Sequence, residues 1–110
     1  MLTNTAPVAA TGAVTSDITE ISAGNGYSAG GSACTGVTYT QTGGTATLAA
    51  TAPTFTASGG NIGPFQYIVA VDTTVSGGKL ICFWNRGSAL TLTDTDTYTP
   101  SLASGIFTLV

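Results

Sequence analysis

The clearest periodic pattern in the chain is an alternation of apolar and other residues between positions 65 and 71. The residues on the apolar face are Phe65, Tyr67, Val69 and Val71. A period of two is the spacing at which side chains return to the same face of a β-strand. We therefore predict a strand here and assign these four side chains to the core.

A second apolar run covers residues 79–85, and both of its faces are apolar. Leu80, Cys82 and Trp84 alternate with Ile81 and Phe83. Such a strand is expected in the centre of a sheet, or where it meets a second sheet or a subunit. We add Leu80, Cys82 and Trp84 to the candidate core. The Gly77-Gly78 pair before the run predicts a hairpin with residues 65–71.

Several shorter strands are predicted around these two. They cover residues 37–41 and 45–50, which flank Gly43-Gly44 as a second hairpin, and residues 54–57, 89–93 and 106–110. No stretch has helical periodicity. Short strands separated by glycine turns predict an all-β fold, a small antiparallel β-sandwich or barrel with a glycine-rich loop, formed by residues 15–110 as a single domain.

The first 14 residues have no such pattern. Their small side chains are typical of a flexible tail, or of an extended N-terminal arm that orders only on a neighbouring protein. They contain no basic stretch, and Pro7 and Gly12 interrupt the apolar positions, so we expect no signal peptide.

The low charge of the chain limits the classes of partner that we expect. Only 6% of the 110 residues are charged, the net charge is −3, and Lys79 and Arg86 are the only basic side chains. A nucleic acid or an anionic membrane needs a cluster of basic residues, so we expect neither as a partner. A surface with so little electrostatic repulsion suggests that other proteins or further copies of the chain cover part of it.

Residues 24–29, GNGYSA, match the G-x-G-x-x-G/A pattern of a dinucleotide-binding turn. That turn needs a following helix and an acidic residue about 20 positions later. The next residues are rich in glycine and threonine, and no acidic residue occurs between Glu20 and Asp72. We therefore interpret the segment as a packed loop anchored by Tyr27, in contact either with its own core or with a partner. The candidate protein contact residues are Gly24, Asn25, Gly26, Tyr27, Gly30 and Gly31.

The chain offers little catalytic chemistry. It has no histidine, so Ser-His-Asp and Cys-His arrangements are absent. Two carboxylates at this spacing, Asp94 and Asp96, are a candidate pair for binding calcium or sharing a proton, but we expect them to cap turns. Trp84 with Arg86 is a candidate carbohydrate or cation–π site, but a core role for the tryptophan fits its apolar neighbours better. We expect no enzyme activity, no cofactor and no metal.

The two cysteines, Cys34 and Cys82, are too few for a zinc site without histidine. A disulfide between them would require maturation outside the cytosol. We expect two buried free thiols.

Four short motifs carry a resemblance to a known class of protein. The stretches DITEI (17–21), GNGY (24–27), GG (30–31) and GGNIGPFQY (59–67) resemble small uncharacterised proteins encoded among the virion structural genes of tailed bacteriophages. The likeness covers roughly residues 16–110. It implies a structural protein of the particle, and at this size a capsid decoration, or cement, protein.

The resemblance also implies partners and a location. Decoration proteins are typically compact β folds that sit on the outer capsid surface, often as trimers. The expected partners are therefore the major capsid protein and further copies of the chain, in a virion assembled in the host cytoplasm.

Three other functions remain open at this stage. A tail, neck or head-fibre component could use the same domain. A host-surface or carbohydrate-binding module is suggested by Trp84 and Tyr98. A secreted pilin-like or adhesin domain would require the cysteine disulfide.

Overall fold

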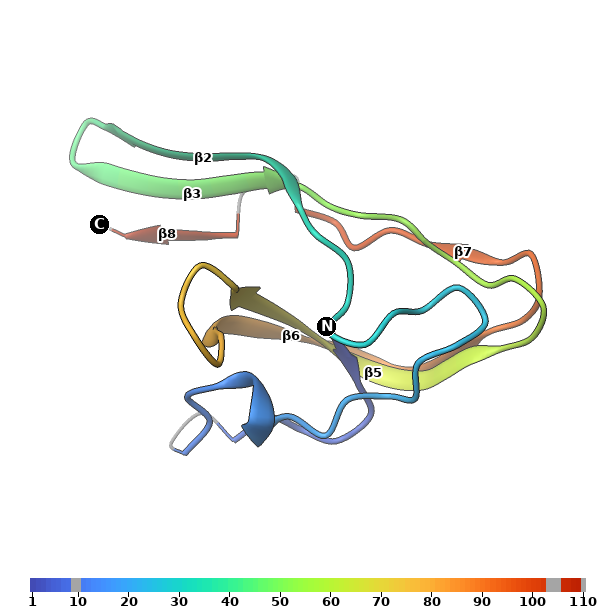
Figure 1. Ribbon diagram of the computed structural model, residues 1–110. Helices are drawn as coiled ribbons and strands as arrows, with labels where there is room; N and C mark the ends of the chain where they lie inside the picture. The colour runs from blue at the N-terminus through green and yellow to red at the C-terminus, as the bar shows by residue number, and fades with distance from the viewer. Residues whose placement is uncertain (9–10, 103–105, 110) are drawn as a thin grey trace.

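The chain folds into antiparallel sheets with almost no helix (Figure 1). The computed structural model describes residues 1–8, 11–102 and 106–109. Its strands are β1 (Leu2–Thr3), β2 (Thr35–Thr42), β3 (Thr45–Thr51), β4 (Phe55–Thr56), β5 (Ile62–Asp72), β6 (Lys79–Leu92), β7 (Thr97–Tyr98) and β8 (Phe107–Leu109), and a 3-10 turn, η1, covers Thr15–Asp17. The strand orders are β1-β5-β6, β2-β3-β8 and β4-β7. The predicted all-β class is confirmed.

The hairpin of β5 and β6 is the largest element of the fold. It confirms the predicted pairing of residues 65–71 with residues 79–85, with Ile68 opposite Trp84 and Val69 opposite Phe83. The expected separate strand at 89–93 is the far end of β6, because β6 continues to Leu92. A long strand can cross both regions because glycine and register shifts bend it without ending it.

The expected single apolar face of residues 65–71 is divided in the structure. The register shifts between Phe65 and Tyr67, so the alternation changes phase there. Phe65 packs in the core cluster together with Ile68, whereas the Tyr67 ring packs edge-on against Phe83. A β-bulge re-aims the side chains that follow it, which a strict period of two does not anticipate.

The second hairpin, β2–β3, turns at Gly43-Gly44 as predicted. Gly43 and Gly44 have φ values of +58° and +86°. These values match a type I′ turn, whose two central residues both need positive φ. Strand β8 pairs with the other side of β3. Val110, which the expected strand 106–110 included, lies outside the described residues. In Figure 1 this three-stranded sheet extends away from the β5–β6 hairpin.

The N-terminal residues differ from the expected arm. Leu2 and Thr3 form β1, pair with Ile68 and Tyr67 of β5, and are both fully buried. Further on, the Leu80 amide donates a 3.1 Å hydrogen bond to the carbonyl of Ala13. Two buried residues are too short a signal for periodicity analysis, because a pattern needs several repeats before it is visible.

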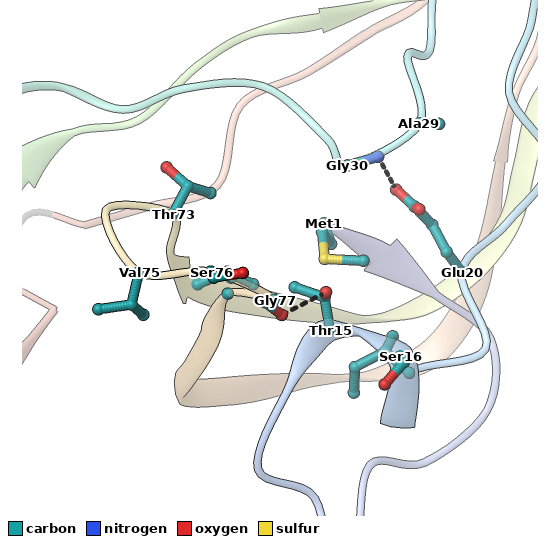
Figure 2. A pocket seen from close by; sticks show the side chains of 13 residues that line it. Met1, Thr15, Ser16, Glu20, Ala29, Gly30, Thr73, Val75, Ser76 and Gly77 are labelled. Atoms are coloured by element: carbon teal, nitrogen blue, oxygen red, sulfur yellow. Dashed lines mark hydrogen bonds between the residues drawn. The ribbon is translucent and has the colours of Figure 1, made fainter.

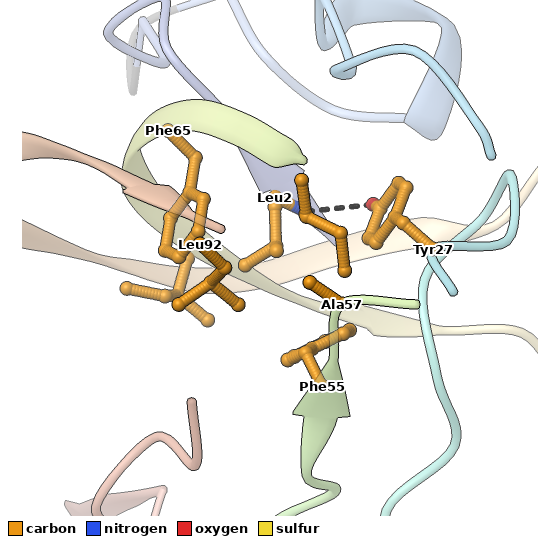
Figure 3. Close-up of a cluster of buried hydrophobic side chains, with 8 residues drawn as sticks. Leu2, Tyr27, Phe55, Ala57, Phe65 and Leu92 are labelled. Atoms are coloured by element: carbon orange, nitrogen blue, oxygen red, sulfur yellow. Dashed lines mark hydrogen bonds between the residues drawn. The ribbon is translucent and has the colours of Figure 1, made fainter. Parts of the chain in front are cut away.

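The core lies between β1, β5 and β6 on one side and the segments of β4 and β7 on the other (Figure 3). Its buried members are Leu2, Tyr27, Phe55, Ala57, Ile62, Phe65, Ile68 and Leu92, with Ile21, Trp84, Leu90 and Tyr98 packed against them. Of the seven predicted core residues, Phe65 and Val69 are buried. The other five, Tyr67, Val71, Leu80, Cys82 and Trp84, are half-buried.

Candidate functional site

The glycine loop closes on itself through a four-residue turn. Gly24 and Tyr27 exchange two backbone hydrogen bonds, of 2.8 and 3.0 Å. Between them Asn25 and Gly26 both have positive φ, +54° and +97°. Asparagine and glycine are the residues that adopt this region at least cost, so the GNG sequence determines the local shape of the loop.

Tyr27 anchors this loop to the core, as the sequence predicted. Its side chain is 3% exposed, and its ring centroid lies 5.8 Å from that of Phe55. Its hydroxyl accepts a 2.9 Å hydrogen bond from the Leu2 amide (Figure 3). The same hydroxyl donates a 2.6 Å hydrogen bond to Oε1 of Glu20. Burial, followed by the hydrogen bond to Glu20, raises the pKa of Tyr27 above its usual value.

Glu20 also fixes the second half of the loop. Its Oε1 accepts a 2.7 Å hydrogen bond from the Gly30 amide (Figure 2). One carboxylate oxygen thus joins the Tyr27 side chain to the backbone after it. A hollow of about 720 Å³ lies between this carboxylate, η1 and the turn at Gly77. Figure 2 shows the side chains that line it and the hydrogen bond that the Thr15 hydroxyl donates to the Gly77 carbonyl.

Two of the loop glycines approach the rest of the fold so closely that a side chain would not fit. A Cβ on Gly26 would collide with the carbonyl oxygen of Thr56, and one on Gly31 would lie 2.9 Å from the Met1 backbone. For Gly24 and Gly30, no atom of the described residues lies within 4 Å of such a Cβ. The loop therefore packs on its own core at Gly26, Tyr27 and Gly31. Gly24, Asn25 and Gly30 are exposed, and a partner contact at these three residues stays a prediction.

The loop is followed by a turn at Ala29-Gly30 and then by irregular residues 31–34, which lead to β2. The pattern GNGYSA therefore lacks the helix N-terminus on which a pyrophosphate would bind. This agrees with interpreting the loop as a structural element.

Of the paired carboxylates, Asp96 caps its own turn, as expected, and Asp94 does not. Asp94 accepts a 2.8 Å hydrogen bond from the Gly59 amide and so joins two segments that are distant in the sequence. Asp96 accepts hydrogen bonds from the hydroxyl and the amide of Thr93, and these lower the pKa of its carboxyl. Within the described part of the chain, no three His, Cys, Asp or Glu residues gather as metal ligands would.

Trp84 packs against the buried core, as predicted. Arg86, two residues further along β6, donates to the carbonyl and hydroxyl oxygens of Ser88. The Arg86 guanidinium therefore forms its hydrogen bonds within its own strand.

Both cysteines are free thiols, but their burial differs from the expectation. Cys82 is half-buried, and burial raises the pKa of its thiol. Cys34 is exposed, because it lies in the connection between the glycine loop and β2 rather than in a strand that faces the core.

The structure also places large apolar side chains on the surface. On β2, Val37 and Tyr39 are 61% and 60% exposed, and on β6 Ile81 and Phe83 are 39% and 38% exposed. For β6, exposure of this kind agrees with the sequence, because the two apolar faces of residues 79–85 predict contact with a second sheet or a subunit. The exposure of Val37 and Tyr39 was not predicted, because alternation shows which residues share a face and not whether that face is covered.

An apolar cleft of about 710 Å³ opens between the two larger sheets. Val37 and Leu48 of the β2–β3 hairpin line it on one side, and Ile68 and Trp84 of the β5–β6 hairpin on the other. The part of its wall formed by these four side chains offers apolar contact area, which is typical of surfaces that bind another molecule.

Among the described residues, no helix is long and apolar enough to cross a membrane. Comparison of the chain with protein-family models, with curated proteins and with solved structures gives no match.

Proposed function

We propose that this chain is a structural protein of a bacteriophage virion, and that it acts as a capsid decoration protein on the outer surface of the assembled capsid. The proposal combines the resemblance of residues 16–110 with a surface suited to protein contact. The observation that carries it is the pair Ile81 and Phe83 on β6, two large apolar side chains that remain 39% and 38% exposed. Exposed apolar clusters of this kind mark surfaces that a partner covers.

The geometry around Phe83 explains why a partner would bind there. The Phe83 ring packs edge-on against Tyr67 at 6.2 Å between centroids, so the two rings form a rigid apolar surface. Aromatic side chains give large contact areas at low entropic cost and are enriched in interfaces. The nearest charged residues along β6, Lys79 and Arg86, lie on either side of this pair and would contribute to a polar rim.

Binding of this kind needs no reaction. A protein that binds only the assembled lattice stabilises it by RT ln(1 + [L]/Kd), which is about 2.7 kcal/mol per site at a hundredfold excess over Kd. The proposed partners are the major capsid protein and further copies of the chain. The proposed role is therefore to increase the resistance of the particle to heat and internal pressure.

The test mixes the purified chain with capsids that lack it and measures binding by co-sedimentation. We expect saturable binding and a higher temperature of DNA release. Phe83→Thr keeps a strand-forming residue but removes the ring, and we expect its Kd to rise about tenfold or more. Thr91→Ser, at an exposed position of the same strand, is the matched control and should bind like the parent.

Three results would contradict the proposal. The first is absence of binding by a folded parent chain, and the second is localisation of labelled protein at one vertex or along the tail, which would indicate a tail, neck or head-fibre component. The third is specific glycan binding that is lost in Trp84→Ala, which would indicate a carbohydrate-binding module.

A further inference from the structure

Strand β2 forms a long open edge of the second sheet. Its sheet has the order β2-β3-β8, so β3 pairs with one side of β2 and the other side faces outward. All eight residues from Thr35 to Thr42 are exposed. An open edge of this length presents a row of backbone donors and acceptors that another strand can pair with.

The other sheet edges in the described structure have features that discourage pairing. β1, β4 and β7 have two residues each, and β8 has three. β6 has 14 residues but carries Lys79 and Arg86, a positive-φ glycine at Gly87 and register shifts along its length. Short edges, charges and bulges are the usual protection against edge-to-edge pairing.

β2 has almost none of this protection. It contains neither a charged residue nor a proline, and no charged residue occurs anywhere between Glu20 and Asp72. Its single irregularity is the register shift between Thr35 and Thr38, which leaves Thr38–Thr42 regularly paired with β3. Two copies of this segment can therefore approach each other without repulsion between like charges.

The turn geometry identifies which backbone groups face outward. In a two-residue type I′ hairpin the residues that flank the turn, here Thr42 and Thr45, form a hydrogen-bonded pair. Hydrogen-bonded pairs then alternate along the ladder, so Thr40 and Thr38 also bond to β3. The amides and carbonyls of Tyr39 and Gln41 consequently point to the open edge.

We propose that β2 pairs antiparallel with β2 of a second copy of the chain, about a two-fold axis at Thr40. The result is one continuous sheet in which Tyr39 bonds to Gln41 of the other copy and the two Thr40 side chains lie opposite each other. This pairing assigns self-association of the chain to the β2 edge. It is independent of capsid binding, because it requires only a second copy of the chain.

Both faces of the joined sheet continue across the axis. Thr38, Thr40 and Thr42 share one face with Thr45 and Thr47 of β3, whereas Val37 and Tyr39 share the other with Leu48. An antiparallel two-fold pair keeps equivalent faces on the same side. The exposed apolar face of each copy is thereby extended into that of its partner, which adds apolar contact to the backbone hydrogen bonds.

The first test measures the mass of the purified chain by size-exclusion chromatography with light scattering. We expect twice the chain mass of 10.9 kDa. Thr40→Lys places two like charges opposite each other and should raise the dissociation constant more than about tenfold. Thr47→Lys is the matched control, because it adds the same charge to the same face one strand away from the edge. Mixing Thr40→Lys with Thr40→Glu should restore the dimer as a mixed pair.

A second measurement uses the parent chain alone. Hydrogen exchange at the Tyr39 and Gln41 amides should be slow in the concentrated protein and faster on dilution. A parent mass of one or three chains would overturn the proposal. So would an unchanged mass for a folded Thr40→Lys variant, equal dissociation by Thr47→Lys, or fast exchange of both amides at every concentration. Loss of capsid binding with the dimer intact would instead count against the proposed function alone.

Discussion

The Tyr27 hydroxyl lies 2.6 Å from Oε1 of Glu20 and donates its hydrogen to that carboxylate, while it accepts the Leu2 amide at 2.9 Å. This one side chain therefore joins the first strand, the segment before the glycine loop and the loop itself. A buried hydroxyl with a partner on each side leaves both partners unsatisfied when it is removed.

Replacement of Tyr27 by phenylalanine should destabilise the fold. The ring and its contact with Phe55 remain, but the Leu2 amide loses its acceptor and Glu20 loses a donor. We expect the free energy of unfolding to fall by about 1–3 kcal/mol. Urea unfolding followed by Trp84 fluorescence measures this. Tyr39→Phe removes a hydroxyl from a side chain that is 60% exposed, so it should change stability little. Equal effects of the two substitutions would contradict the role of the network.

Alkaline pH should destabilise the protein through the same residue. The folded state raises the pKa of Tyr27, so the unfolded chain releases this proton first. The stabilisation is complete below the ordinary tyrosine pKa of about 10 and is lost as pH rises above it, by about 1.4 kcal/mol per pH unit. The measurement is urea unfolding between pH 8 and about 11.5. The parent and Tyr27→Phe should converge in stability over this range, and parallel curves would show that Tyr27 is not the titrating group.

Gly26 should tolerate no side chain. An alanine there would meet the carbonyl oxygen of Thr56 and would also hold a positive φ of +97°. Gly30 has a similar φ of +87°, but among the described residues the space around it is open. Gly30→Ala therefore measures only the free-energy cost of holding an alanine at positive φ, which is about 1–2 kcal/mol. We expect Gly26→Ala to lower the thermal midpoint well beyond Gly30→Ala. Similar midpoints for the two variants would mean that the loop moves away from Thr56.

Phe65→Ala should be the most damaging substitution in the core. Phe65 is fully buried and packs edge-on against Tyr98 at 5.3 Å between ring centroids. Truncation leaves a cavity and should cost about 3–5 kcal/mol. Phe83→Ala removes the same ring from a side chain that is 38% exposed, and thermal unfolding should show a smaller loss. A larger loss of stability for Phe83→Ala than for Phe65→Ala would contradict the position of the core on the Phe65 side of the β5–β6 hairpin.

Several features of the fold were predictable from local sequence. The two hairpins followed from Gly43-Gly44 and Gly77-Gly78 between apolar runs, because glycine adopts the positive φ that such turns need. Turn capping by Asp96 also followed from local chemistry, because its partner Thr93 is three residues away. These inferences depend on residues close together in sequence, for which spacing determines geometry.

Other features depended on contacts between distant residues. The register shift between Phe65 and Tyr67 divides a regular alternation. Leu2 belongs to the core because it pairs with Ile68 and contacts Tyr27, both far away in the sequence. Cys34 is exposed and Cys82 half-buried although both are small apolar residues. Burial is decided by which segments pack together, and composition does not contain that information.

The all-β class, the two glycine hairpins and the low charge can be read from the residues in order along the chain. That the first residues join the β1-β5-β6 sheet, that the glycine loop packs on its own core and that β2 is left as an open edge became clear from the folded arrangement. Alternation and turn chemistry act over a few residues, whereas burial and strand neighbours are set by packing across the whole chain.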